Sequence, residues 1–362
     1  MTRLHDLFDQ QGQSPWLDNL RRGWITSGEL SRWVDDGVRG LTSNPSIFQK
    51  AIAGSSDYTE QFADLLGSGA SVEESYWGLV TTDIVDALAL LRPVYDTTDG
   101  LDGYVSVEVD PGLAHDTAGT EAAARGLDQS IAAPNLYVKI PGTLAGLPAI
   151  ETMISEGRSI NVTLLFSVDR HRAVMEAYLA GLEACEGDLS GVSSVASFFV
   201  SRVDTEVDRR LEAIGSEAAL ALRGRVAVAN AKLAYAAFRD TFRGPRWEAL
   251  VARGARVQRP LWASTSIKND AYPDTLYVDE LIGPDTVNTL PDNTLAAFID
   301  HGRIERTIDV DVEGAQAVID GCAAVGVDLD DVTAQLEHEG VTAFEKSFDE
   351  LLGTLREEAD RL

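Results

Sequence analysis

The chain has 362 residues, a size that a single α/β barrel with insertions can reach around one core. Hydrophobic residues make up 44% and charged residues 24%, which is the composition of a folded globular protein and excludes a disordered chain. The formal net charge of -28 excludes binding to nucleic acid or to an anionic membrane surface, because both would repel the protein.

The N-terminal segment has no apolar stretch of signal-peptide length, and no segment approaches the ~20 apolar residues that a membrane span needs. We therefore expect a cytoplasmic protein without membrane contact. The two cysteines, Cys185 and Cys322, lack CxxC or CxH spacing. They are predicted to be packed core thiols, not disulfide partners or zinc ligands.

Short apolar runs alternate with stretches of helical spacing between residues 14 and 290, as in a parallel βαβα sheet. Runs such as residues 195–200 are apolar at most positions, which suits strands covered by helices. The predicted strands are Ser14–Asp18, Val38–Thr42, Tyr104–Val109, Leu136–Ile140, Ser159–Leu164, Ser193–Val200, Arg259–Ser264 and Tyr277–Val287. Eight such units favour a closed (β/α)8 TIM-type barrel over an open sheet.

Helical spacing predicts helices between these strands and in the tail. They are Asn44–Ala53, Ser71–Leu91, Thr117–Ser130, Thr143–Glu156, Ser167–Ala184, Glu217–Arg239 and Pro291–Asp300. The tail from Asp309 to Leu362 is predicted to form additional C-terminal helices packed on the barrel. Residues 1–362 are thus predicted to form a single domain.

Lys139 is one of only five lysines and lies in the apolar run Leu136–Ile140. Burial disfavours an ammonium, and a neutral amine in a pocket can attack a carbonyl to form a Schiff base. Two alternatives stay open: Lys139 extends to solvent at the strand end, or it pairs with a structural carboxylate.

A Schiff-base enzyme needs a carboxylate to move protons near its lysine. Alternation along residues 105–110 places Glu108 and Asp110 on one face, and the barrel interior is the better environment for both. Asp18 is a third candidate, although an Asp at this position can instead cap the following helix.

Polar residues also follow several other strands, where the loops of a barrel surround its mouth. Asn44 can cap a helix that begins at Pro45, or it can orient a substrate hydroxyl. Alternation puts Asn161 and Thr163 on one face of their strand. A final group could hold a phosphate through hydroxyls and cations: Ser197, Arg202, Ser264, Ser266 and Lys268.

Each cation in this group has a simpler interpretation. Arg202 could form a salt bridge with Asp204 or Asp208, and Lys268 could be a solvated loop charge near Asp270. The five histidines show no HxxH or HExxH spacing, and no phosphate-binding glycine motif occurs. The sequence therefore predicts no metal site and no cofactor.

Five segments together resemble the transaldolase family: LTSNPS (residues 41–46), VEVD (107–110), VKIPGT (138–143), INVTLLFS (160–167) and WASTSIKN (262–269). The segment Tyr277–Thr289 and the long tail resemble its larger bacterial branch. By this resemblance, Lys139 is the Schiff-base nucleophile, Glu108 and Thr163 hold a proton-shuttling water, and Asp18 deprotonates the sugar. Substrate hydroxyls would bind Asn44, Asn161 and Ser197.

The resemblance also implies phosphate binding by Arg202 and Ser264. Some members carry a second arginine after this serine, and here Ser266 or Lys268 would take its place. The implied enzyme is a transferase of aldehyde or ketone residues in the non-oxidative pentose phosphate pathway. It moves dihydroxyacetone from sedoheptulose 7-phosphate or fructose 6-phosphate to glyceraldehyde 3-phosphate or erythrose 4-phosphate.

Two other functions remain open. A plain aldolase would use the same residues but release dihydroxyacetone to water. A non-catalytic binding or scaffold barrel would use Lys139 only as an ion-pair partner. An acidic surface is compatible with a monomer or a homodimer.

Overall fold

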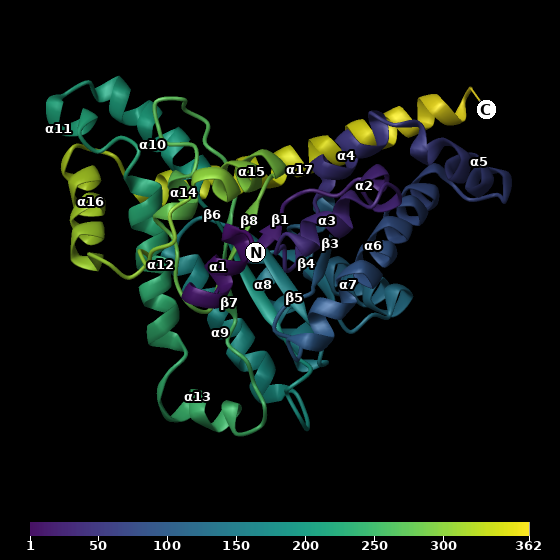
Figure 1. The fold of residues 1–362 in the computed structure, drawn as a ribbon, viewed down its shortest axis with the longest axis horizontal. Coiled ribbons are helices and arrows are strands. Elements are labelled where there is room, and N and C mark those ends of the chain that lie inside the picture. Colours follow the sequence, from purple (N-terminus) through teal and green to yellow (C-terminus); the bar gives the residue numbers. More distant parts are fainter. Residues whose placement is uncertain (362) are drawn as a thin grey trace.

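Eight parallel strands form a closed barrel in chain order, with helices around it (Figure 1). The computed structural model describes residues 1–361. The strands are β1 (Gln13–Leu17), β2 (Leu41–Thr42), β3 (Val105–Glu108), β4 (Leu136–Pro141), β5 (Ile160–Leu165), β6 (Ser194–Phe199), β7 (Arg259–Ala263) and β8 (Thr286–Leu290). Because β1 pairs with both β2 and β8, the sheet has no free edge. The predicted (β/α)8 barrel is confirmed.

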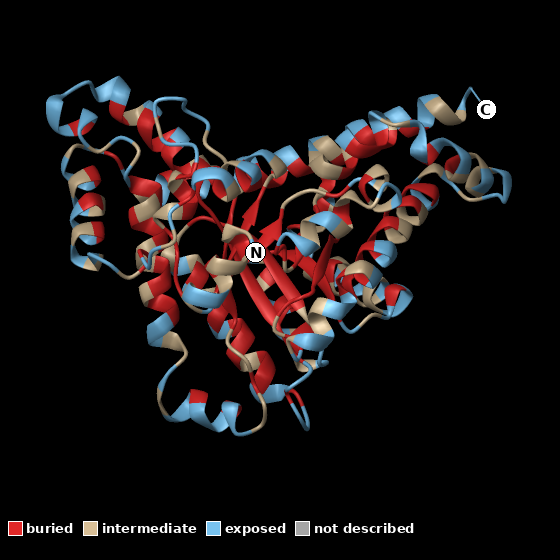
Figure 2. Ribbon diagram, viewed as in Figure 1, coloured by how far each residue is buried: buried red, intermediate tan, exposed pale blue. Residues whose placement is uncertain are grey.

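Every strand residue is buried, as expected when helices cover one face of a sheet and the barrel interior is packed (Figure 2). The helices that precede β6 in the chain are α1 (Arg3–Gln11), α2 (Arg22–Thr26), α3 (Glu29–Asp35), α4 (Pro45–Ala53), α5 (Thr59–Gly67), α6 (Val72–Thr97), α7 (Thr117–Ile131), α8 (Gly146–Ser155) and α9 (Val168–Ala184). After β6 come α10 (Ser201–Ile214), α11 (Glu217–Leu220), α12 (Val226–Thr241), α13 (Gly244–Val251), α14 (Leu276–Asp279), α15 (Asp292–His301), α16 (Val312–Ala324) and α17 (Leu329–Ala359). None of the helices in the described part of the chain is long and apolar enough to cross a lipid bilayer.

Local signals explain several helix starts. Asn44 accepts a hydrogen bond from the backbone N–H of Ile47, and Pro45 occupies the first turn of α4. Ser71 and Glu74 form a capping box at the start of α6. These helices begin within a residue of where the sequence predicts them.

Two predicted elements are wrong. The predicted strand Tyr277–Val287 contains the short helix α14, and the eighth strand is instead Thr286–Leu290. A short buried apolar run is compatible with either structure, so its pattern does not distinguish them. The predicted helix Glu217–Arg239 is interrupted between α11 and α12, where Gly224 adopts a left-handed conformation with φ 68°.

The C-terminal tail is helical and packs on the barrel, as predicted. α17 contacts α4, α6, α10 and β5, and it spans the top of the molecule in Figure 1. A hydrogen bond between the hydroxyls of Ser46 and Ser347, 2.7 Å apart, joins α4 to α17. α16 packs mainly on α12. Cys185 and Cys322 are buried and are not joined in a disulfide, as the sequence predicts.

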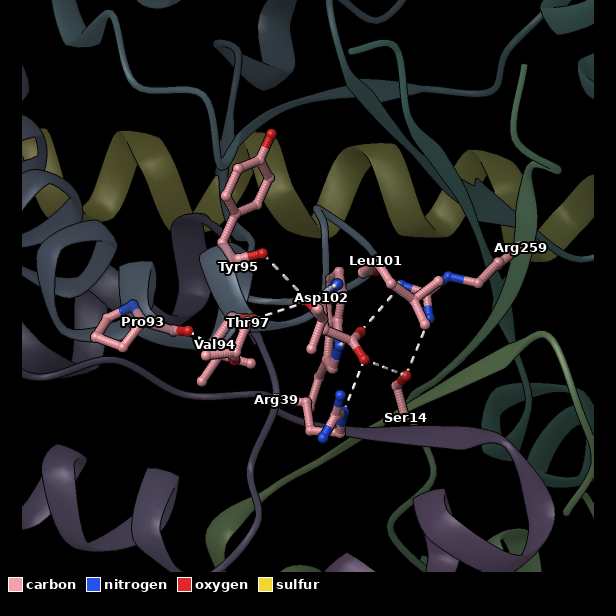
Figure 3. A network of polar contacts seen from close by, with 11 residues as sticks. Ser14, Arg39, Pro93, Val94, Tyr95, Thr97, Leu101, Asp102 and Arg259 are labelled. Atoms are coloured by element: carbon pink, nitrogen blue, oxygen red, sulfur yellow. Dashed lines mark hydrogen bonds and ion pairs between the residues drawn. The ribbon is translucent and has the colours of Figure 1, made fainter. Parts of the chain in front are cut away.

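The amino-terminal ends of the strands are closed by a buried polar network around Asp102 (Figure 3). The carboxylate of Asp102 accepts hydrogen bonds from Ser14 and Arg39, both at 2.8 Å, and from Arg259 and Trp16, both at 3.1 Å. Although complete burial opposes it, Arg259 and Arg39 hold the pKa of Asp102 below its usual value. The carboxylate of Asp102 is thus fully hydrogen-bonded, and the network around it closes the end of the barrel opposite the strand carboxyl ends.

His171 on α9 presents the contrasting case of a buried polar side chain without partners. Neither ring nitrogen has a hydrogen-bond partner in the described structure, and the ring lies 5.8 Å from that of Phe198. Burial lowers the pKa of His171 from 6.5 to about 4, so the folded protein keeps this ring neutral.

This depressed pKa predicts a pH-dependent loss of stability. The unfolded chain takes up a proton below pH ~6.5 and the folded protein does so only near 4, so stability falls as the pH drops between these values. Replacing His171 by leucine should reduce the loss of unfolding free energy between pH 7.5 and pH 5 by about 2 kcal/mol. Denaturant titrations at both pH values measure it. An equal pH dependence in wild type and His171→Leu would contradict the prediction, and His338→Leu on exposed α17 surface is the control.

Candidate active site

A cavity of about 780 Å³ opens at the carboxyl ends of the strands. It is the place where a (β/α)8 barrel carries its chemistry, because the loops after all eight strands meet there. Nine of the eleven residues predicted for the site line it: Asp18, Asn44, Lys139, Thr163, Ser197, Arg202, Ser264, Ser266 and Lys268. Glu108 and Asn161 lie behind this lining.

Lys139 lies at the floor of the cavity beside Glu108. The two residues are direct partners in the register of β3 and β4, so their side chains project from the same face of the sheet. Lys139 Nζ lies 3.1 Å from Glu108 Oε2 and donates a hydrogen bond to the Ser43 carbonyl at 3.2 Å. The two side chains are nearly excluded from solvent, since Lys139 is 4% and Glu108 5% exposed. Of the two alternatives for Lys139, extension to solvent is therefore wrong, and the carboxylate partner is Glu108.

The Glu108 carboxylate is incompletely satisfied. Its contact with Lys139 is an ion pair that lacks the alignment of a hydrogen bond, and within residues 1–361 neither of its oxygens receives one. Burial raises the pKa of Glu108, although the charge of Lys139 acts against this shift. Glu108 also lines a void of about 10 Å³, which is close to the volume that one water occupies.

Thr163 is the second unsatisfied group at the floor. Its hydroxyl is buried and has no hydrogen-bond partner among the described residues. Thr163 lies within a register shift of β5 between Val162 and Leu165, and the next residue, Leu164, takes a left-handed conformation with φ 61°. Strained backbone of this kind gathers at functional sites, where it aims a particular side chain.

Asp18 follows β1 and accepts a hydrogen bond from the Thr42 hydroxyl at 2.9 Å. The alternative that Asp18 caps the next helix is wrong, because α2 is preceded by Arg21. Burial raises the pKa of Asp18, opposed by the charge of Lys139 and by the Thr42 hydrogen bond. Asp110 also differs from the prediction: it lies past the end of β3 and accepts a hydrogen bond from the Gly112 N–H.

The side-chain amide of Asn161 forms hydrogen bonds through both its nitrogen and its oxygen. It donates to the Ser106 hydroxyl at 3.0 Å and accepts from the Ser197 hydroxyl at 2.7 Å. Ser197 lines the cavity, whereas Asn161 is completely buried beneath it. Asn44 differs from Asn161, because its carbonyl oxygen caps α4 while its side chain still reaches the cavity wall. Capping and substrate contact are thus compatible in Asn44.

The cations predicted for phosphate binding line one side of the cavity. Arg202 forms no ion pair with Asp204 or Asp208, and no side-chain hydrogen bond from it is found in the described chain, so the salt-bridge alternative is wrong. Burial lowers the pKa of Arg202, and the nearby Asp18 opposes this shift. The guanidinium lies over the rings of Phe199 and Phe344, 5.2 and 5.9 Å from their centroids.

Ser264 and Lys268 follow β7 on the same side. Ser264 has the left-handed φ of 55°, and its hydroxyl lies 2.9 Å from that of Ser201. Lys268 is at the exposed rim and donates to the Ser266 hydroxyl at 2.6 Å. Partial burial, followed by the charge of Arg202 and then Lys50, lowers the pKa of Lys268. This accumulation of positive charge suits an anion.

The comparisons with known proteins agree with this arrangement. A family model described as transaldolase/fructose-6-phosphate aldolase matches residues 15–355. This chain belongs to that family. The transaldolase of Mycobacterium leprae (strain Br4923) is 54% identical, over 96% of this chain and 95% of the relative. The transaldolase of Saccharopolyspora erythraea is 52% identical, over 97% and 96%, and transaldolase 2 of Streptomyces coelicolor is 49% identical, over 100% and 99%.

In this family member, Thr42, Lys50 and Phe344 are among the cavity-lining residues that were not predicted from the sequence. The Thr42 hydroxyl donates a hydrogen bond to Asp18, and Lys50 on α4 adds a further cation to the lining. Phe344 comes from α17 and lies 5.9 Å from Lys139 Nζ, measured to the ring centroid. Thr42 and Lys50 lie close to Asn44 in the sequence, and this closeness to a predicted site residue could have indicated that they belong to the site. Phe344 lies in the distant tail, where no local pattern points to the site.

The raised pKa of Asp18 predicts that the site lowers the stability of the fold. A buried carboxyl with a raised folded pKa stabilises the protein below the unfolded pKa of ~3.9 and loses this contribution as the pH rises. We expect Asp18→Asn to increase the unfolding free energy by about 1 kcal/mol at pH 7.5 and to have little effect near pH 3.5. Denaturant unfolding at the two pH values measures both.

Asp102→Asn is the contrasting control, because Asp102 is a fully buried carboxylate with a lowered pKa and four hydrogen-bond donors. It should destabilise the protein by about 3–5 kcal/mol at pH 7.5, since the buried Arg259 and the partly buried Arg39 lose their charge partner. Destabilisation by Asp18→Asn at pH 7.5 would contradict the interpretation of Asp18.

Proposed function

We propose that this protein is a transaldolase. It transfers a dihydroxyacetone unit from fructose 6-phosphate or sedoheptulose 7-phosphate to erythrose 4-phosphate or glyceraldehyde 3-phosphate. The observation that carries the proposal is the amine of Lys139, buried at the floor of a large cavity and 3.1 Å from the carboxylate of Glu108. Relatives named transaldolase at 49–54% identity support the same reaction.

The first step is formation of an imine. Lys139 Nζ, once it has lost a proton, attacks the C2 carbonyl carbon of the ketose and gives a carbinolamine. The carbinolamine then loses its oxygen as water, which requires one proton to reach that oxygen. Glu108 is close enough to accept and return protons, directly or through a water held between its carboxylate and the Thr163 hydroxyl. The unsatisfied state of both groups supports a water at this place.

The second step breaks the bond between C3 and C4. Asp18 removes the proton of the C4 hydroxyl, the C4 carbonyl forms, and the bonding electrons move into the imine to give an enamine. The aldose phosphate leaves, and an acceptor aldehyde enters and reacts in the reverse sense. Burial raises the pKa of Asp18 toward neutral pH. A carboxylate with a higher pKa holds a proton more strongly and is therefore a better general base.

Binding groups surround this reaction path. In the proposal, Asn44 and Ser197 contact substrate hydroxyls, and Asn161 acts by fixing the Ser197 hydroxyl. Arg202 and Ser264 bind the phosphate, with Ser266 and Lys268 in the place of a second arginine. Local positive charge is needed here because the protein as a whole carries -28.

The chain acts in this proposal as one domain, 1–362, in the cytoplasm, as a monomer or a homodimer. The imine requires neither a metal ion nor an organic cofactor in the mechanism proposed. Among residues 1–361, no group of three or more His, Cys, Asp or Glu side chains is arranged to hold a metal.

The proposal is tested by borohydride reduction in the presence of fructose 6-phosphate, followed by peptide mass mapping. Wild-type protein should carry a sugar-derived adduct on Lys139, because only an imine is reduced to a stable bond. Lys139→Ala should carry no adduct and should lose at least about 10⁴-fold in kcat, since covalent catalysis is removed. Circular dichroism checks that the variant is folded.

Asp18→Asn is the matched variant for this experiment. It should still form the adduct on Lys139 but lose about 10²-fold or more in kcat, because imine formation precedes the step that needs Asp18. An unlabelled Lys139 in active wild-type protein would overturn the mechanism. Absence of both turnover and label would favour a binding barrel.

Product analysis separates transfer from simple aldol cleavage, which the same residues could catalyse. We expect free dihydroxyacetone to form at less than about a tenth of the rate at which sedoheptulose 7-phosphate forms when erythrose 4-phosphate is present. A rate of dihydroxyacetone release that does not depend on the acceptor would identify a plain aldolase. Coupled assays for both products measure the partition.

A further inference from the structure

The phosphate-facing residues come from two elements that are not adjacent in sequence. Arg202 lies in the first turn of α10, and Ser264, Ser266 and Lys268 lie in the β7–α14 loop, residues 264–275. α10 and α14 lie together at the upper left of Figure 1. The distance between the two sets of groups therefore depends on what holds the loop against α10.

The start of the loop is well anchored. The Ser264 carbonyl accepts a hydrogen bond from the Ser201 N–H at 3.0 Å, and the Thr265 hydroxyl donates to the Thr289 carbonyl at 2.9 Å. Beyond this point the contacts become sparse. Of residues 266–273, Tyr272 is the one whose side chain hydrogen-bonds to another element in the described structure. The position of Lys268 thus depends on the packing of its neighbour Ile267 against the core and on the hydrogen bond of Tyr272.

Tyr272 is held from two sides. Its hydroxyl donates to Asp208 Oδ2 at 2.6 Å, while Asp208 Oδ1 accepts from the Gly224 N–H at 3.0 Å. Its ring also lies against Gly224, where a β-carbon would come within 2.6 Å of Tyr272 Cζ. Asp208 is 8% exposed, so this hydrogen bond is largely shielded from water.

A parallel contact lies one helical turn earlier on α10. The Tyr277 hydroxyl donates to Asp204 Oδ2 at 2.8 Å, and Asp204 Oδ1 accepts from the Ala227 N–H at the start of α12. Asp204 and Asp208 thus each join the segment that follows β7 to the backbone near α12. Both carboxylates lie on the helix that carries Arg202.

The side chain of Lys268 could occupy a second cleft if the loop moved. It lines the main cavity and also a cleft of about 170 Å³ whose walls include Asp208, Glu212 and Tyr272. These carboxylates compete with a bound phosphate for the ammonium of Lys268. A loop that is released from α10 would allow that competition to weaken phosphate binding.

We propose that Tyr272 and Asp208 are positioning residues for the phosphate group: their hydrogen bond sets the β7–α14 loop against α10 and so holds Lys268 and Ser266 opposite Arg202. The proposal rests on the proposed function, since it names the residues that shape the phosphate end of that same site. Neither residue touches the reacting carbons. Their loss should therefore affect phosphorylated substrates selectively.

The test compares Tyr272→Phe with wild type at saturating fructose 6-phosphate, with erythrose 4-phosphate or unphosphorylated erythrose as the acceptor. The substitution removes one hydroxyl and keeps the ring on Gly224. We expect KM for erythrose 4-phosphate to rise about fivefold to tenfold with kcat within about twofold, and KM for erythrose to stay unchanged. Asp208→Asn, which weakens the same hydrogen bond from the other side, should give the same pattern.

Calorimetric titration with inorganic phosphate gives a readout that does not require turnover. The Kd of phosphate should rise about fivefold to tenfold in Tyr272→Phe. Tyr235→Phe is the matched control, because it removes a hydroxyl that donates to the Pro284 carbonyl at 3.0 Å, away from the loop. It should leave both KM values and the phosphate Kd unchanged.

Unchanged phosphate affinity in Tyr272→Phe, or equal losses with both acceptors, would overturn the positioning role. Failure of the proposed function has a different signature: wild type would neither turn over sugar phosphates nor form an adduct on Lys139. Weaker phosphate binding by Tyr272→Phe in such a protein would still support the role of Tyr272 and Asp208.

Discussion

An ammonium and a carboxylate lie 3.1 Å apart at the floor of the cavity, in Lys139 and Glu108, and both are almost excluded from water. Removing two charges from water costs several kcal/mol for each ion, and their attraction offsets this cost only in a rigid environment. The closed barrel supplies that environment, because the register of β3 and β4 makes the two residues direct partners. The Ser43 carbonyl accepts a hydrogen bond from the ammonium. The Glu108 carboxylate is buried and receives no hydrogen bond from the described residues.

The two ends of the barrel treat buried charge in opposite ways. At the amino-terminal end, Asp102 has four donors and a lowered pKa, so its charge strengthens the fold. At the carboxyl end, Asp18 and Glu108 have raised pKa values, both caused mainly by burial, and few donors. Unsatisfied groups destabilise a fold but remain available to a substrate. The difference between the ends locates the chemistry without reference to any relative.

The surface and the cavity also have opposite electrostatic character. The chain carries -28, yet Arg202, Lys268 and Lys50 line one cavity. Only in the tertiary structure do these cations meet, because they come from the helix after β6, the loop after β7 and the helix after β2. Burial, followed by repulsion from Arg202 and Lys50, lowers the pKa of Lys268, and a bound phosphate would offset the repulsion. Holding the cations together therefore requires contacts elsewhere, such as those of Tyr272 and Tyr277 with α10.

The barrel, seven of its eight strands to within a few residues, and most of the residues at its mouth could be predicted from the sequence, because strand periodicity and helix caps are local properties. The order of five short segments along the chain also carried the resemblance to a family. The sequence did not determine the last strand, where a short apolar run forms α14. The pairing of charges became visible in the folded structure alone: Lys139 pairs with Glu108, and neither Asp204 nor Asp208 pairs with Arg202. The tertiary structure also brought Phe344 from α17 to the cavity. Such choices depend on distances between elements that lie far apart along the chain, and local pattern contains no information about those distances.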